Sequence, residues 1–570
     1  MNPRLKLTIV LVFAMGLLWA TGANAQFLTV LNSNVPAGFG QAGYIQTATL
    51  GSDGGGTLTM NGITMIVPAN SVVQFPANTL RWADLFDPNV SKPVYDTTGV
   101  PIEPNLSITC TPPALTCTGL ALLDNPAQTA GLSPYLPFNA NVLGNIDTKN
   151  VTGLGVDTYI VGLILPIGQD LGNGGAGLIT FIDYAKGRFE VGGQLNTPGT
   201  GTVIELNDPL GRYGWAHSPD PRWSVDPDNP TIAAGNGYPM CIPRFAPPKI
   251  DLNCPLFNRP LNPSGAGQDP FVQPGAPLMV VNMPPSAKPG TTKPDPWKEA
   301  PFMVGDYVAY AGVMYKNNPS APIDPAVPWN QQTYISANTV GADKVALYTA
   351  PCPTGTENCT SSVGPAYVQL ARMVIGTGGA TPGTNVLPNA SLGIIGGQIP
   401  LPEPKNNIVI VGFVTDSTQL VDVMAADIDP NNGNETDRVL GTILPEPGIV
   451  VGGVGRGNKG RFRFEVGKGS FGNRTRVYLA QSHHGTVRVP NQTHKIHPPE
   501  GGLISGQYHA PMFTFFFPDA PPGFPIIPQN FDSMPFLIQG EGGNPSAGPL
   551  SPFPPYCPVS GSPPLPTCQP

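Results

Sequence analysis

Apolar and polar residues alternate over short stretches of the chain, which is the pattern of half-buried β-strands. The clearest case is a pair of alternating runs at residues 57–60 and 63–67, separated by Asn61 and Gly62. Because Asn-Gly accepts the positive φ angles of a two-residue turn, this pattern predicts a β-hairpin. No segment keeps apolar residues at helical spacing over three turns. We therefore expect an all-β protein.

A five-residue string, Arg-Phe-Glu-Val-Gly, occurs twice, at residues 188–192 and 463–467. Around the second copy, Phe462, Phe464 and Val466 alternate with charged residues, which predicts a strand with one buried and one solvated face. Residues i and i+2 of a strand share a face, so Arg and Glu should form an exposed pair worth under about 1 kcal/mol. We assign the string to the fold and not to chemistry.

Other short strands are expected at regular intervals, which favours small barrels or sandwiches. They are predicted at residues 159–164, 177–182, 202–206, 306–315, 334–340, 345–348, 408–414 and 476–479.

The repeated string belongs to a series of features that runs in the same order in two halves of the chain. Each half has a Cys-x6-Cys pair, a Val-Gly strand start (161–162, then 411–412), the string itself and a longer Cys pair. This order predicts two tandem units, residues 26–254 and 301–514, each an OB-like small β-barrel or a sandwich with long Pro/Gly-rich loops. A Pro-rich linker (255–300) would join them, and a Pro-rich extension (515–570) would follow.

The first 25 residues have the pattern of a secretory signal peptide. Arg4 and Lys6 precede an apolar run at residues 7–20, and Ala23-Asn-Ala25 is a small-residue cleavage site. The apolar run, about 14 residues, is shorter than the roughly 20 that span a bilayer. We expect a secreted or periplasmic protein with no transmembrane segment after cleavage.

Cysteine usage agrees with export, because all eight cysteines fall in locally spaced pairs. Local pairing predicts four disulfides: Cys110–Cys117, Cys241–Cys254, Cys352–Cys359 and Cys557–Cys568. The alternative for Cys-x6-Cys is half of a zinc site, but no His or third Cys is close by.

Composition adds two constraints. The 69 Gly and 71 Pro residues interrupt helices throughout, while 40% hydrophobic residues argue against disorder. After signal cleavage, 29 − 2 = 27 basic residues face 37 acidic ones, a net charge of −10. No nucleic-acid partner is expected, and attraction to an anionic membrane is disfavoured.

Several strings in the middle of the chain resemble a group of uncharacterised secreted proteins of bacteria and fungi that contain OB-like β modules. They include Asn-Asp-Pro-Leu-Gly-Arg (207–212), Asp-Pro-Arg-Trp-Ser-Val-Asp-Pro (220–227), Pro-Met-Cys-Ile-Pro-Arg (239–244), Cys-Pro-Leu-Phe-Asn-Arg-Pro (254–260) and Val-Gly-Asp-Tyr-Val (304–308). The resemblance covers residues 55–445 and implies a secreted, all-β protein; it implies no activity.

A histidine cluster is the sharpest candidate for chemistry. Five of the six histidines fall within 27 residues, and a methionine follows them: His483, His484, His494, His497, His509 and Met512. Imidazole binds Cu and Zn, and a thioether favours copper(I). Convergence of these side chains would form a metal site; the alternative is a solvated polar loop.

Two acidic segments are further candidates. Alternating oxygen ligands at Asp427, Asp429, Asn431 and Asp437 suggest a calcium loop, although Arg438 stands where the bidentate Glu is expected. The other interpretation is an acidic surface turn. Residues 208–228 mix Asp, Arg, Tyr and His, as in a glycosidase site or in an ordered loop fixed by Asp–Arg pairs. We assign no catalytic residue.

These observations favour an exported structural or binding protein of the cell envelope or extracellular space. Its expected partners are polysaccharide, an envelope protein or a second copy of the chain. One alternative is a metal-dependent extracellular enzyme built on the histidine cluster. Another is an adhesion protein stabilised by calcium.

Overall fold

The computed structural model confirms the all-β class. It describes residues 37–69, 71–76, 79–86, 118–122, 138–147, 158–169, 173–209, 211–226, 231–261, 277–285, 293–318, 321–352, 364–377, 381–387, 399–403, 406–428, 435–451, 454–456, 459–466, 475–484, 493–494, 507–511 and 515–516. Within these residues, strands form two barrels and a sandwich, and the α-helix α3 (Trp329–Gln332) has only four residues.

The first barrel is a ring of five strands. They are β1 (Ala37–Leu50), β2 (Gly56–Met60), β3 (Ile63–Val67), β6 (Phe138–Asp147) and β7 (Thr158–Gln169). Parallel pairing of β3 with β7 closes the ring, and β4 (Val72–Gln74) and β5 (Thr79–Arg81) extend it beside β7. The predicted hairpin is confirmed as β2–β3, with Asn61 and Gly62 at φ 51° and 76°.

The second barrel repeats this connectivity with β8 (Gly174–Asp183), β9 (Arg188–Val191), β10 (Thr202–Leu206), β15 (Tyr307–Lys316) and β16 (Thr333–Ala342). In both barrels the first three strands form a meander, the fourth pairs with the first, and the fifth runs parallel to the third. This is the connectivity of an OB-like barrel.

The longest connection of each barrel lies between its third and fourth strands, at residues 68–137 and 207–306. The second of these insertions includes the 3-10 turns η4 (Pro221–Trp223) and η5 (Leu256–Asn258) and four short strands: β11 (Ile232–Ala234), β12 (Met240–Cys241), β13 (Val280–Asn282) and β14 (Ala300–Pro301). β11 lies beside β16, β14 pairs with β12, and β13 pairs with β17 (Ala346–Tyr348).

The C-terminal strands form a two-layer sandwich. One sheet has the order β26 (Arg461–Val466), β21 (Asn406–Val414), β18 (Val368–Thr377) and β30 (Phe515–Phe516). The other has the order β28 (Thr493–His494), β23 (Glu435–Ile443), β22 (Val421–Ile428), β27 (Thr475–Ser482) and β29 (Gln507–Pro511). Two separate hairpins are β19 (Thr381–Leu387) with β20 (Ile399–Glu403), and β24 (Ile449–Val451) with β25 (Val454–Arg456).

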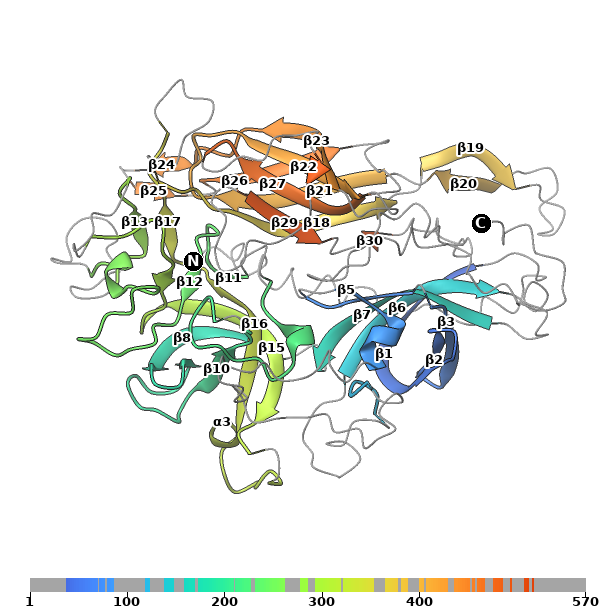
Figure 1. Cartoon of the computed structure of the whole chain (residues 1–570), viewed down its shortest axis with the longest axis horizontal. Helices are drawn as coiled ribbons and strands as arrows, with labels where there is room; N and C mark the ends of the chain where they lie inside the picture. The colour runs from blue at the N-terminus through green and yellow to red at the C-terminus, as the bar shows by residue number, and fades with distance from the viewer. Residues whose placement is uncertain are drawn as a thin grey trace.

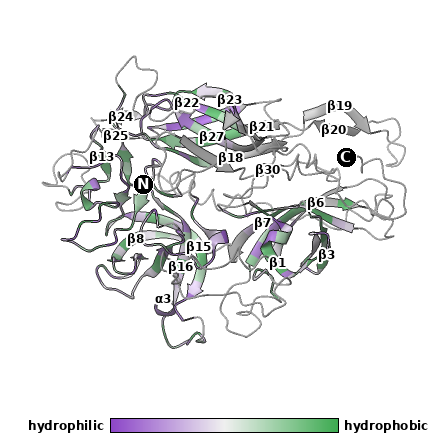
Figure 2. Ribbon diagram, viewed as in Figure 1, coloured by the Kyte–Doolittle hydropathy of each residue, from purple (hydrophilic) through white to green (hydrophobic). Residues whose placement is uncertain are grey.

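The sandwich lies above the two barrels in the view of Figure 1, and the barrels lie side by side. A continuous apolar core joins the second barrel to the sandwich, and the rings of Tyr238 and Tyr367 meet within it at 5.0 Å. The first barrel has its own core, which also takes in Trp223 and Val313. Figure 2 shows hydrophobic and hydrophilic positions along the same strands, in keeping with half-buried sheets.

The sheet pairing does not follow the predicted division into two tandem units. β8 and β10 pair with β15 and β16, so the second barrel spans residues 174–342 and crosses the expected linker. That segment is part of the fold: Arg259 in it forms a buried ion pair with Asp306, at 2.7 Å. Local features of the sequence could not show this, because the pairing joins strands more than 100 residues apart. Of residues 515–570, only β30 is described.

Candidate functional site

The predicted histidine site is divided among separate contacts. His483 Nε2 lies 2.9 Å from an oxygen of Asp422. His484 is fully buried, with Nδ1 2.7 Å from Asp416 Oδ2 and Nε2 2.8 Å from the Gly364 carbonyl oxygen. The two neighbouring histidines therefore contact different carboxylates, and His484 uses both ring nitrogens.

The remaining ligands do not complete a site within the described residues. His494 lies on β28 and His509 on β29, which are opposite edges of the five-stranded sheet. Four interstrand spacings separate these edges, roughly 19 Å across a flat sheet. His497 and Met512 lie outside the described residues. These positions give no support to one shared Cu or Zn centre.

One other group brings ligand types together, namely Cys352, Asp416 and His484, with ligand atoms within 4.8 Å of one another. Cys352 is disulfide-bonded, so its sulfur is not a thiolate; its expected partner, Cys359, lies outside the described residues. Asp416 also accepts hydrogen bonds from the Thr418 amide and hydroxyl. These contacts fit a structural role for the group better than a metal-binding role.

The charge state of Asp416 follows from the hydrogen-bond donors around it. Burial raises the pKa of the Asp416 carboxyl, but hydrogen bonds from His484 and Thr418 outweigh that effect, and the pKa lies below its usual value. Nε2 of His484 can only donate to the Gly364 carbonyl, and Nδ1 faces the ionised Asp416. Both ring nitrogens of His484 therefore face oxygen atoms, which fixes the ring between Asp416 and Gly364.

The calcium candidate falls on the β22–β23 hairpin. Asp427 is on β22 and Asp437 is on β23, where it is fully buried. Asp429 and Asn431 belong to the connection between the strands, outside the described residues. The calcium loop stays a prediction.

The charged stretch at residues 208–228 belongs to the insertion of the second barrel and packs against the first barrel. Arg222 forms a buried ion pair with Asp220 at 2.7 Å and donates from Nη1 to the Thr118 carbonyl oxygen, also at 2.7 Å. Next to it, Trp223 packs on Phe75 and Phe138, on the first barrel, with ring centroids 5.0 and 5.6 Å apart. Asp–Arg pairing therefore fixes an ordered loop here, which was the alternative to an active site. Asp228 lies outside the described residues.

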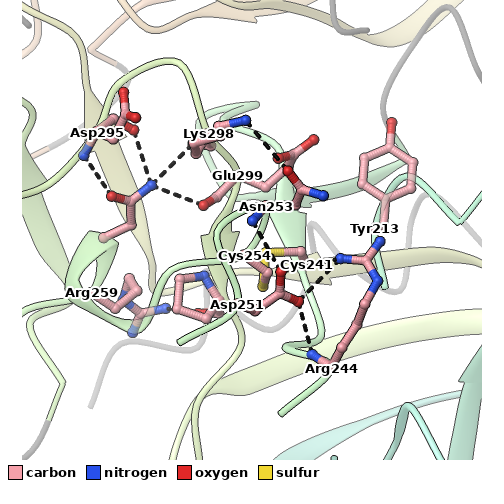
Figure 3. Close-up of a disulfide and its surroundings, with 12 residues drawn as sticks. Tyr213, Cys241, Arg244, Asp251, Asn253, Cys254, Arg259, Asp295, Lys298 and Glu299 are labelled. Carbon is pink, nitrogen blue, oxygen red and sulfur yellow. Dashed lines mark hydrogen bonds and ion pairs between the residues drawn. A yellow bond between two sulfur atoms is a disulfide. The ribbon is translucent and has the colours of Figure 1, made fainter. Parts of the chain in front are cut away.

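The feature that sequence reasoning missed is the surface of a loop closed by a disulfide. Cys241 and Cys254 are bonded, as predicted, and close what we call the stapled loop, residues 241–254. Inside it, Asp251 turns inward and accepts from the Arg244 amide at 2.9 Å and its guanidinium at 3.0 Å (Figure 3). Arg244 also donates to the Gly211 carbonyl oxygen, which anchors the loop to the rest of the insertion.

Apolar side chains stand on the outside of the stapled loop. Ile250 is 53% exposed and Leu252 is 76% exposed, the highest value among large apolar residues in the described part of the chain. Lys249 is also exposed, with Nζ 4.8 Å from the Phe245 ring centroid. The Phe245 ring meets Trp215 edge-on at 6.3 Å. The loop thus presents apolar groups and one cation on a braced backbone.

Electrostatics under the loop support this orientation. Burial raises the pKa of Asp251, but the amides of Arg244 and Asn253 and the Arg244 guanidinium outweigh it, so its pKa lies below the usual value. Nearby, burial raises the pKa of Glu299 to about 7, with Asp208 adding to the rise and Lys298 and Arg244 opposing it (Figure 3). The acids therefore lie beneath the loop, and its outer face carries none.

Comparison with protein-family models, curated proteins and solved structures found no significant match to this chain. In the described part of the chain, none of the helices has the length and apolarity needed to cross a membrane.

Proposed function

We propose that this chain is an exported binding or structural protein of the cell envelope or extracellular space, and that the stapled loop is its binding surface. The pattern of residues 1–25 and the disulfides at Cys241 and Cys352 support export. One observation carries the binding role: a loop held by a disulfide and a partly buried ion pair keeps Ile250 and Leu252 in solvent.

A loop of this kind has a physical reason to bind. Exposed apolar side chains cost free energy in water, and contiguous apolar surface commonly marks interaction sites. Bracing reduces the conformational entropy that would be lost on binding. A catalytic role has less support, because three of the side chains considered for chemistry, His484, Asp220 and Arg222, are buried in structural contacts.

The first experiment tests export. The full chain is expressed in a secretory host, and the N-terminus and the thiol content of the product are determined. We expect cleavage after Ala25, beginning at Gln26, and oxidised cysteines. Retention in the cytoplasm with free thiols would contradict export.

The second experiment tests the binding surface. Wild type is compared with the double variant Ile250→Glu/Leu252→Glu for binding to a panel of glycans, to lipid vesicles and to itself. We expect at least one association that the double variant loses while its thermal unfolding is unchanged. No loop-dependent association with any of these probes would overturn the binding role.

A further inference from the structure

The outer face of the first barrel carries a regular grid of β-branched side chains. On β2 and β3 every second residue is buried in the core, so the residues between them face outward. Residues opposite each other on paired strands share a face, so the register with β1 extends this face to a third strand. Two rows cross the three strands: Thr47, Thr59 and Thr64, then Thr49, Thr57 and Ile66. Neighbours within a row lie about 5 Å apart and the rows about 7 Å apart in a regular sheet.

Hydrogen bonds between hydroxyl groups hold the grid in place. Oγ1 of Thr49 lies 2.7 Å from Oγ1 of Thr57, and Oγ1 of Thr59 lies 3.0 Å from Oγ1 of Thr64. Within each pair one hydroxyl donates and the other accepts, so each pair keeps an O–H donor and lone pairs for a ligand. Threonine is stiff at χ1 because it is branched at Cβ. The hydroxyl groups are therefore ordered before anything binds, which lowers the entropy cost of binding.

The strands that carry the grid are almost without charge. Residues 37–67 comprise β1, β2, β3 and their turns, and they include a single charged residue, Asp53, in the first turn. Across the whole chain 12% of residues are charged. A charged ligand would lose water on this face and find no opposite charge, so the face suits an uncharged ligand.

An aromatic ring and amide side chains continue the surface toward the β2–β3 turn. Tyr44 on β1 is 39% exposed, and its ring adds a flat apolar surface that suits the C–H groups of a sugar ring. Asn61 donates from Nδ2 to Gln41 Oε1 at 3.2 Å. The Gly62 amide donates to Gln46 Oε1 at 2.8 Å. These contacts fix the turn against β1, so the groups beyond the last row are ordered and uncharged.

The corresponding face of the second barrel is closed. On its second and third strands, β9 and β10, Arg188 pairs with the fully buried Glu205, and Nδ1 of His217 from the insertion lies 3.8 Å from the same carboxylate. In the view of Figure 1, β2 and β3 lie on the side of the first barrel away from the second. The open, neutral face is therefore a property of the first barrel and not of the connectivity that the two barrels share.

From this arrangement we infer that the threonine grid on β1, β2 and β3 binds a neutral polysaccharide. Such a polymer repeats hydroxyl donors and acceptors along its length and has no charge to neutralise. Nucleic acids and other polyanions are held through Lys and Arg, which residues 37–67 lack. A protein partner fits less well, because Thr is under-represented among binding hot spots. The grid belongs to a different part of the chain from the stapled loop, and the inference does not depend on that loop.

The test is co-sedimentation of the purified full chain, disulfides intact, with insoluble cellulose, chitin and starch, and with carboxymethyl cellulose as the anionic probe. We expect binding to at least one neutral polysaccharide, little change as salt rises, and weaker binding to the anionic probe. Thr57→Val/Thr59→Val keeps the branched shape but removes the hydroxyls, and it should weaken binding about tenfold. Thr436→Val is the matched control, since Thr436 is exposed on β23 of the sandwich, and it should bind like wild type.

Thermal unfolding of each variant shows whether a loss of binding is a loss of fold. If the double variant is destabilised, Thr64→Lys at an exposed position gives a second measurement, and it should also weaken binding. Binding to none of the neutral polysaccharides, equal binding by the folded grid variants, or a preference for the anionic probe would overturn the inference. If Ile250→Glu/Leu252→Glu abolishes polysaccharide binding and the grid variants do not, the ligand belongs to the stapled loop and the grid inference fails. The reverse result supports the grid whatever the stapled loop binds.

Discussion

The two copies of Arg-Phe-Glu-Val-Gly are identical in sequence and differ in what their charged residues do. Both form strands with a buried phenylalanine: Phe189 on β9 is fully buried, and Phe464 on β26 is 8% exposed. β9 lies between β8 and β10 in the second barrel, whereas β26 is an edge strand of the sandwich. The comparison shows that the local sequence is enough to form the strand, whereas the role of its charged side chains depends on the strands and loops around it.

In the first copy the charged side chains are part of the structure. Glu190 is buried and accepts hydrogen bonds from the amides of Gly199, Thr200 and Gly201 at 2.7, 3.1 and 2.9 Å. Arg188 forms an ion pair with the fully buried Glu205, and its guanidinium lies 4.3 Å from the centre of the Tyr334 ring. The expected exposed pair is therefore wrong for this copy.

In the second copy the prediction is confirmed. Arg463 and Glu465 face each other at 3.1 Å, with side chains 57% and 55% exposed. Solvent screens such a pair, and holding two long side chains together costs entropy, so its contribution is under about 1 kcal/mol.

The largest expected effect is that of Arg188→Ala. Removing the guanidinium takes away the Arg188 partner of the buried Glu205 carboxylate, and breaking a buried ion pair from one side costs about 3–5 kcal/mol. The matched change Arg463→Ala should cost less than about 1 kcal/mol. Denaturant unfolding of both variants measures the difference, and equal shifts would abolish the contrast between the copies.

A smaller effect is expected for Glu190→Gln. The amide has no charge, and its NH₂ group cannot accept from the backbone N–H groups that face it, so we expect a loss of about 2–3 kcal/mol. Hydrogen exchange should accelerate at Gly199, Thr200 and Gly201. Glu465→Gln is the control, and protection at residues 199–201 that survives Glu190→Gln would refute the capping role.

The insertion of the second barrel and the sandwich should also respond to pH in opposite directions. Near the second barrel, Glu299 has its pKa raised to about 7, so the folded state binds more protons than the unfolded one between about pH 4.5 and 7. Its contribution to stability therefore falls as pH rises through this window. Glu299→Gln removes this cost, so its stability relative to wild type should be higher at pH 8 than at pH 5, by about 1 kcal/mol after allowance for solvent screening.

In the sandwich, Asp416 gives the opposite sign. Its lowered pKa contributes stability that is present above the unfolded value, near pH 4, and is lost as pH falls through the folded pKa. Unfolding curves from pH 2 to 8 separate the two windows. A Glu299→Gln profile parallel to that of wild type would show that Glu299 does not set the upper window.

The smallest effect is expected for the double variant Arg463→Ala/Glu465→Ala. Both side chains are more than half exposed and pair with each other, so the free energy of unfolding should change by less than about 0.5 kcal/mol. A larger loss in denaturant unfolding would mean that the edge strand depends on its charges as much as β9 does.

The candidate site was predictable only in part. Pairing of Cys241 with Cys254 follows from their spacing, and it marks where the stapled loop begins and ends. That Asp251 turns inward while Ile250 and Leu252 stay in solvent depends on Arg244 and Gly211, whose positions no local pattern reveals. The histidine cluster shows the converse: His494 and His509 are close in sequence but lie on strands at opposite edges of one sheet.

The sequence by itself determined the features that depend on neighbouring residues: the Asn61–Gly62 hairpin, the buried phenylalanines of the repeated string and the all-β class. Turn chemistry and period-2 alternation act within a few residues and can be read from them. Tertiary structure alone decided that β10 pairs with β16, that the second barrel crosses residues 255–300, and that Glu190 is buried whereas Glu465 is exposed. Strand pairing and burial depend on which distant segments meet, and identical residues acquire different roles when those segments differ.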